Sequence, residues 1–204
     1  KCPNRFGCSA QLQGRIIHLA SRSALDIEGL GEETAALLVT EGLVSSLAEL
    51  FDISPEQLVE YEGFAEKSAA SLVEAIQSKK APDLPQFLIA LGIPEVGTAV
   101  ARDLSGYFGG IEAILGATAE ELEQIDGIGP KMSEVITAFL EDERNRSAID
   151  AILARGVEPV ASVPVDRGFP SVGTAVFTGA LPIPRASAEA AWRAVGGRTA
   201  SSVS

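Results

Sequence analysis

The chain has 204 residues, of which 46% are hydrophobic and 5% aromatic, so it can form one or two domains with buried cores. No apolar run reaches the roughly 18 to 20 residues of a membrane helix, and we expect a cytoplasmic protein with no membrane partner. The few aromatic residues argue against an interface that stacks bases, and the net charge of −12 opposes long-range attraction to a polyanion.

Residues 1–22 form a basic segment that contains both cysteines. The segment carries four basic groups and no acidic one. Cys2 and Cys8 could form a disulfide, remain two buried thiols or ligate zinc, although a structural disulfide is rare in a cytosolic protein. A structural zinc ion needs about four ligands, of which this pair supplies two. His18 could add a ligand, but a single histidine on an arginine-bearing helix is more often exposed.

Residues 23–157 contain four tandem repeats. A small residue after a predicted turn recurs with spacings of 34, 32 and 32 residues, at Gly31, Ala65, Gly97 and Gly129. Four other columns match: a small residue four places later (Ala35, Ala69, Ala101, Ser133), an aliphatic one seven places later (Leu38, Leu72, Leu104, Ile136), and apolar residues one place earlier (Leu30, Phe64, Val96, Ile128) and four places earlier (Ile27, Tyr61, Ile93, Ile125). Agreement in every column indicates one repeated structural unit.

The spacing of these columns predicts a pair of helices in each repeat. The small residue and the aliphatic residue after it lie on one stripe of a helix that begins just after the turn. Glycine in the turn allows backbone conformations and close approach that other residues resist. Pro55–Val59 and Thr118–Glu123 are predicted first helices, with Ser54 and Thr118 as N-caps. Each repeat is therefore a helix, a tight apolar turn and a second helix.

Two features follow the repeats. Residues 144–156 predict an amphipathic helix that Gly156 ends, with Ile149, Ile152 and Leu153 on its apolar face. Residues 158–170 hold three prolines and little periodicity, which predicts a linker.

The last part of the chain, residues 171–204, reads as the start of an α/β domain. Thr174–Phe177 predicts a short buried strand, Ala186–Val195 a helix with Trp192 in the core, and Arg198–Ser204 a second strand. A strand, a helix and a parallel strand in this order are the opening unit of such a fold.

Each turn followed by a helix N-terminus is a predicted phosphate site. Free backbone N–H groups point outward there, the helix dipole favours an anion, and a missing Cβ lets a phosphate approach. This geometry needs no basic surface, and residues 23–160 carry eight basic and 26 acidic groups, a charge of −18. The alternative is a helical protein-interaction array in which the glycines only permit tight turns. Such arrays do not require an apolar residue between two glycines before every second helix.

The turns resemble those of the helix-hairpin-helix family. The resemblance rests on Gly29-Leu30-Gly31, Gly63-Phe64-Ala65, Gly127-Ile128-Gly129-Pro130-Lys131 and the degenerate Val96-Gly97. Ala65 and Glu95 each stand where the pattern has glycine. The family implies binding to the DNA minor groove and sugar-phosphate backbone without sequence readout. The DNA-binding residues implied here are Gly29, Gly31, Gly63, Ala65, Lys67, Gly97, Thr98, Gly127, Gly129 and Lys131.

The chain as a whole resembles the C-terminal part of bacterial NAD-dependent DNA ligases. The runs that carry this are Cys2-Pro3-Asn4, Cys8-Ser9-Ala10-Gln11, Arg15-Ile16-Ile17-His18, Ser21-Arg22, Asp26-Ile27-Glu28-Gly29-Leu30-Gly31, Phe87-Leu88-Ile89-Ala90-Leu91-Gly92-Ile93 and Arg144-Asn145-Arg146. By resemblance, Cys2 and Cys8 are the last pair of a four-cysteine zinc finger. The expected fold is mainly α, with half of a small zinc finger in 1–22, four helix-hairpin-helix motifs in 23–157, a linker in 158–170 and the start of a BRCT domain in 171–204.

The BRCT resemblance rests on Gly173-Thr174-Ala175-Val176-Phe177-Thr178-Gly179 and Ala194-Val195-Gly196-Gly197. In that fold Thr178 and Gly179 precede the first helix, where a phosphate can bind. The equally weighted alternative is that Thr178 only caps a turn.

The chain carries no recognisable catalytic residues, so the resemblance implies that it positions nicked duplex DNA for an enzyme that seals nicks in replication and repair. The adenylation and oligonucleotide-binding domains of the intact enzyme would perform adenylation with NAD and magnesium. This chain would be a piece of that enzyme, and those two domains would be its partners. The competing interpretation is a DNA-binding module from another repair or recombination protein, where two units and no cysteine pair are expected.

Overall fold

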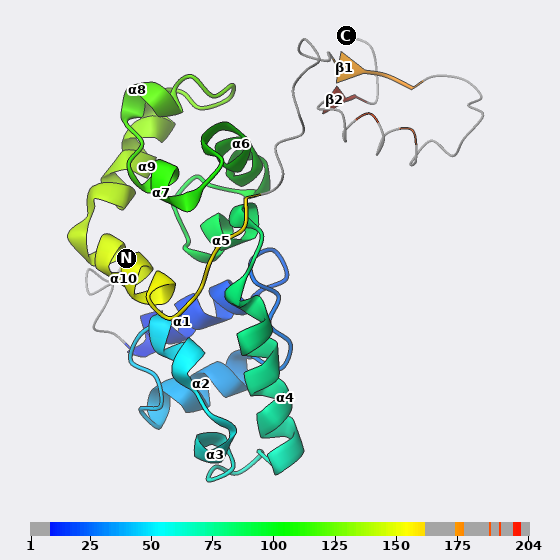
Figure 1. The fold of residues 1–204 in the computed structure, drawn as a ribbon, viewed down its shortest axis with the longest axis vertical. Coiled ribbons are helices and arrows are strands. Elements are labelled where there is room, and N and C mark those ends of the chain that lie inside the picture. Colours follow the sequence, from blue (N-terminus) through cyan, green and yellow to red (C-terminus); the bar gives the residue numbers. More distant parts are fainter. Residues whose placement is uncertain (1–8, 162–173, 178–187, 189–191, 193–197, 201–204) are drawn as a thin grey trace. The chain divides into compact units, whose positions relative to one another are not determined.

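The computed structural model describes residues 9–161, 174–177, 188, 192 and 198–200. They belong to two compact units, Lys1–Ser162 and Val163–Ser204. The first unit is helical (Figure 1), with α1 (Ser9–Ala20), α2 (Glu32–Thr40), η1 (Ala48–Asp52), α3 (Pro55–Leu58), α4 (Glu66–Gln77), η2 (Ser78–Lys80), α5 (Leu84–Ala90), α6 (Thr98–Phe108), α7 (Ile111–Leu115), α8 (Ala119–Leu122), α9 (Pro130–Glu141) and α10 (Glu143–Leu153). The prediction of a mainly α fold is confirmed.

The helices of the first unit share one hydrophobic core that runs from Ile16 to Val157. Helices contact each other in pairs, α1 with α2, α3 with α4, α5 with α6, and α8 with α9. Each of these pairs contains one of the four predicted turns. Contacts between α1 and α5, and between α10 and η1, join the first half of the repeat array to the second.

The second helix of each repeat begins at the residue that the periodicity predicts. Helices α2, α4, α6 and α9 start one residue after the reference positions Gly31, Ala65, Gly97 and Gly129. All eight residues four and seven places after those positions are buried, with at most 3% of the surface of each exposed. The small residues let the paired helices approach closely, and burial of each larger side chain stabilises the fold by about 1.5–3 kcal/mol.

The two predicted N-caps are both found at helix starts. The Thr118 hydroxyl oxygen accepts the backbone N–H of Glu121 at 3.2 Å, which fixes the first turn of α8. At α3 the backbone N–H of Ser54 donates to Oε1 of Gln57 at 2.9 Å. The pKa of Glu56 in the same turn is lowered by its own backbone N–H and by the Ser54 hydroxyl. These bonds pair donors that the helix itself leaves unpaired.

The helix predicted over 144–156 is present as α10 and is capped by a residue that sequence reasoning did not single out. The Asp142 carboxylate accepts the backbone N–H of Arg144 at 2.9 Å. Helix α10 ends at Leu153, and the chain turns away at Gly156, whose φ of +78° lies in the left-handed region that favours glycine.

The start of the predicted linker, 158–170, is paired with the chain before α5. The Val160 N–H donates to the carbonyl of Pro82, and the Leu84 N–H donates to the carbonyl of Val160, both at 2.8 Å. Residues 162–170 lie outside the described part of the chain.

In the second unit, β1 (Thr174–Ala175) and β2 (Arg198–Thr199) pair in parallel, the direction that the sequence predicted. The strands are shorter than expected, and Ala175, Val176 and Phe177 are half-buried instead of buried. Trp192, which we expected in a core, is helical and also half-buried. Most of the predicted helix 186–195 and the residues after 200 lie outside the described residues.

Candidate nucleic-acid interface

The four turns, residues 27–31, 61–65, 93–97 and 125–129, close with the same backbone hydrogen bond. In each turn the donor is the N–H of the residue one place before the reference position. The acceptor is the carbonyl of the residue four places before the reference position. The pairs are Leu30 to Ile27 at 3.4 Å, Phe64 to Tyr61 at 3.2 Å, Val96 to Ile93 at 3.2 Å, and Ile128 to Ile125 at 3.0 Å. The repeat seen in the sequence is therefore a repeat in backbone geometry.

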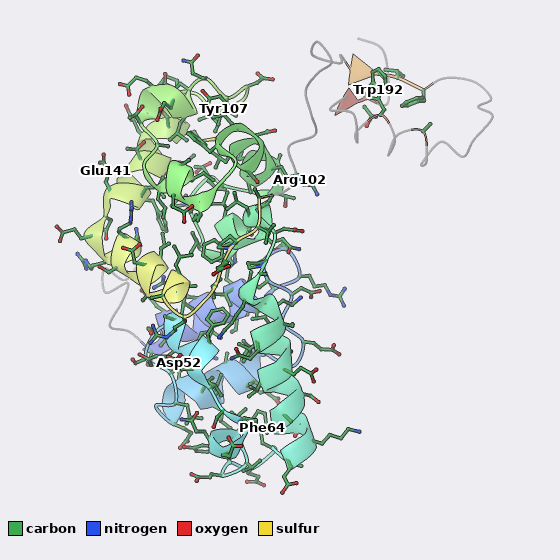
Figure 2. The ribbon with its side chains drawn as sticks, in the orientation of Figure 1. Asp52, Phe64, Arg102, Tyr107, Glu141 and Trp192 are labelled. Carbon is green, nitrogen blue, oxygen red and sulfur yellow. The ribbon has the colours of Figure 1, made fainter. Side chains whose placement is uncertain are left out.

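Apolar residues anchor three of these turns to the core. The residues one and four places before the reference position are buried in the first, third and fourth turns. In the second turn both Tyr61 and Phe64 are only half-buried; Phe64 is labelled in Figure 2. A turn held by buried side chains presents its backbone in a fixed orientation, which a backbone-binding site needs.

The first position of each turn motif requires a left-handed backbone. Gly29, Gly63 and Gly127 have φ values of +82°, +95° and +92°. Glu95 occupies the same place in the third turn with φ of +66°, although it has a side chain. A left-handed backbone at this position is therefore a requirement of the turn itself, and glycine adopts it without strain.

The second position has no such requirement, so the expectation that turn glycines serve backbone conformation holds only at the first position. The φ values at Gly31, Ala65, Gly97 and Gly129 lie between −89° and −97°, in the extended region that any residue adopts. A Cβ built on the three glycines would meet no atom within 4 Å. Ala65 consequently fits in the second turn without strain. Neither conformation nor packing within the described residues explains glycine here.

Backbone N–H groups at the start of the second helices differ from turn to turn. No described side chain caps the helices that follow Gly31, Gly97 and Gly129. In the second turn the Ala65 N–H donates to the Ser68 hydroxyl at 3.0 Å. In the third, the Gly97 N–H donates to the carbonyl of Glu95 at 3.2 Å. The first and fourth turns therefore leave the reference N–H without a described protein acceptor.

Side chains at these helix starts decide how well an anion fits. Helix α2 begins with the exposed carboxylates of Glu32 and Glu33, which compete with a phosphate for the same N–H groups. Helix α9 begins with Pro130 and the exposed Lys131. Thr98 starts α6, and Lys67 follows Glu66 at the start of α4; Thr98, Glu66 and Lys67 are all exposed. The fourth turn offers an anion the best local charge.

A groove of about 330 Å³ links the third and fourth turns. It is lined by Glu95, Gly129, Pro130, Lys131, Met132 and Val135. The groove therefore combines the start of α9 with the first position of the third turn. Residues from two turns that are 32 residues apart in sequence therefore line one groove.

A larger polar groove of about 830 Å³ lies at the first turn and brings in two cations that sequence reasoning missed. Arg22 and Lys79 line it together with Gly29 and Gly31, and Asp26 and Glu28 line it as well. Lys79 reaches this place because α4 packs against the turn, with a Leu72 methyl 3.6 Å from where a Gly29 Cβ would lie. Only the fold brings these residues together, so the local pattern contained no signal for Lys79.

His18 is exposed, as expected, yet it makes a specific contact. Its Nε2 lies 2.7 Å from the carbonyl oxygen of Ile89, which ties α1 to α5. Among the described residues no group of three or more His, Cys, Asp and Glu side chains is arranged to hold a metal ion, and no helix is both long and apolar enough to cross a membrane. The predicted site residues Cys2, Cys8, Thr178 and Gly179 lie outside the described residues.

Comparison with known families agrees with this geometry. Residues 21–78 match the family described as a SAM-like helix-hairpin-helix tandem, and residues 86–149 match the helix-hairpin-helix motif family. Together the two matches contain all four turns. The chain thus contains helix-hairpin-helix motifs.

Similarity to curated proteins extends over the whole chain. A protein named DNA ligase from Haloquadratum walsbyi is 42% identical over 100% of this chain, one from Halorubrum lacusprofundi 43% over 100%, and one from Alkalilimnicola ehrlichii 41% over 100%. The chain is homologous over its whole length to a segment of DNA ligases. It spans 27%, 29% and 31% of the length of these three relatives.

Proposed function

We propose that this chain binds and positions nicked duplex DNA within an NAD-dependent DNA ligase, by holding the sugar-phosphate backbone at four helix-hairpin-helix turns. The observation that carries the proposal is the second position of the turn motif. Gly31, Gly97 and Gly129 are extended and open, so glycine there serves an approaching group and not the fold. Helix N-termini without a side-chain cap supply donors and a favourable dipole at the same place.

The four turns contribute unequally in this proposal. The fourth is the strongest because it has both glycines, no acidic residue in the first turn of its helix, and Lys131. The third follows, with the Thr98 hydroxyl, and then the second, where Glu66 offsets Lys67. The first is the weakest at its helix start because of Glu32 and Glu33.

Binding by the isolated chain is expected to be weak and independent of DNA sequence. Its contacts are to the backbone, and the charge of −18 on residues 23–160 repels DNA at long range. In fluorescence anisotropy with a nicked duplex, the slope of log affinity against log salt should be shallow, about −2 to −3, as for two or three neutralised phosphates. Nanomolar binding that distinguishes between duplex sequences would contradict the proposal.

Zinc is part of the proposal for the intact enzyme. Two thiolates six residues apart, Cys2 and Cys8, form half of the four-cysteine donor set that suits a structural zinc ion. Bound zinc would fold the segment before α1 and so set the direction in which that helix begins. NAD and magnesium would be used by the adenylation and oligonucleotide-binding domains, and Thr178 and Gly179 would offer a further phosphate contact.

The metal is tested by replacing one ligand. Elemental analysis of the full-length protein, purified without added metal, should find one zinc that Cys8→Ser removes and that Ser9→Ala, next to it, leaves in place. A covalent bond between the sulfurs of Cys2 and Cys8 in protein kept under reducing conditions would refute the zinc assignment.

A further inference from the structure

Glu95 is the one turn residue that keeps a side chain where the other three turns have a left-handed glycine. Its φ is +66°, against +82°, +95° and +92° at Gly29, Gly63 and Gly127. A residue with a Cβ is strained in this region, and glycine would relieve the strain. Strained residues cluster at functional sites, which points to a role for this side chain. Within the described residues no salt bridge joins the Glu95 carboxylate to its own turn, and the side chain instead lines a groove.

The Glu95 side chain is exposed and lines the groove that leads to the start of α9. Among the six residues that line this groove, Glu95 is the only acid and Lys131 the only base; the others are Gly129, Pro130, Met132 and Val135. No salt bridge joins Glu95 to Lys131 in the described structure. The carboxylate therefore acts on the groove as an unpaired negative charge.

We propose that Glu95 is an affinity-limiting residue, whose carboxylate opposes the binding of a DNA phosphate in the groove at the fourth turn. This inference rests on the proposed function, because it concerns the same site. A phosphate held by the α9 N-terminus and Lys131 must approach a fixed like charge. The repulsion raises the rate at which the DNA leaves, which suits a surface that has to release its product after each nick is sealed.

Two substitutions separate the charge of Glu95 from its backbone strain. Glu95→Gln removes the charge and keeps the left-handed residue, while Glu95→Gly removes both. Glu74→Gln, at an exposed position on α4, changes the net charge by the same amount and lies outside this groove. Full chains carrying each change would be titrated with a fluorescent nicked duplex, and their melting temperatures measured.

We expect Glu95→Gln to bind about three- to tenfold more tightly than the unsubstituted chain at low salt, with an unchanged melting temperature and a gain that disappears at high salt. Glu95→Gly should show the same gain and melt about 1–3 °C higher, because the strain is gone. Glu74→Gln should change binding less than twofold.

The outcomes distinguish this inference from the proposed function. If Glu95→Gln and Glu74→Gln change DNA affinity equally while Lys131→Glu still weakens binding, the role of Glu95 is overturned and the proposed function stands. No binding by the unsubstituted chain or by Glu95→Gln would overturn the proposed function and this inference with it.

Discussion

Replacing Gly129 by valine is expected to weaken binding of nicked duplex about 10- to 100-fold and to leave the melting temperature unchanged. The backbone at Gly129 is extended and a Cβ there meets nothing within 4 Å, so the fold accepts the larger residue. The valine side chain would instead fill the space through which a phosphate reaches the helix N-terminus. Loss of hydrogen bonds to a charged group costs about 1.5–3 kcal/mol, which corresponds to that change in affinity.

Two other glycine-to-valine substitutions serve as controls for this result. Gly127→Val should destabilise the fold, because φ is +92° at Gly127 and a β-branched residue is strained there. Gly31→Val occupies the corresponding open position in the first turn, where two carboxylates already disfavour a phosphate, so it should affect binding much less. Equal losses of affinity in Gly31→Val and Gly129→Val would refute the ranking of the four turns.

Lys131→Glu is expected to weaken binding by about 1–2 kcal/mol, or roughly 5- to 30-fold, because it removes a charge-assisted contact and adds repulsion. Lys131 is exposed and stands at the second position of α9, so its replacement should leave the core intact. Anisotropy titrations at two salt concentrations should show a loss that shrinks as salt rises.

The opposite change at the first turn is the matched comparison. Glu33→Lys places a cation where Lys131 stands in the fourth repeat, and it should leave binding unchanged or strengthen it. Arg102→Glu, on the side of α6 beyond its first turn, controls for net charge; Arg102 is labelled in Figure 2. A loss with Arg102→Glu as large as that with Lys131→Glu would show that bulk charge, and not the turn, governs binding.

Periodicity predicted where the second helices start because two local constraints coincide there. A buried small residue and a buried aliphatic residue, such as Ala101 and Leu104, fix the helix face, while the turn before them fixes the helix start. Both constraints act within a dozen residues, so the sequence alone contains them. The prediction that hairpin turns join paired helices succeeded for the same reason.

The features that the sequence did not predict depend on contacts between distant segments. Lys79 comes to the first turn only because α4 packs on Gly29, and Val160 pairs with Pro82 only after the repeats have folded. The different roles of the two glycines could not be predicted either, because the sequence does not distinguish a glycine required for its positive φ from a glycine required for open space. Ala65 and Glu95, the two departures from the pattern, carried that distinction once their φ values were known.

The most direct test of backbone binding at the turns is to follow the amide N–H groups themselves. In ¹H–¹⁵N correlation spectra of the chain titrated with a nicked duplex, we expect the largest shifts at Lys131, Thr98 and Ala99, where the N–H groups start α9 and α6. Smaller shifts should appear at Glu32 and Glu33. Shifts confined to α10, with the amides of the third and fourth turns unmoved, would contradict backbone binding at the turns.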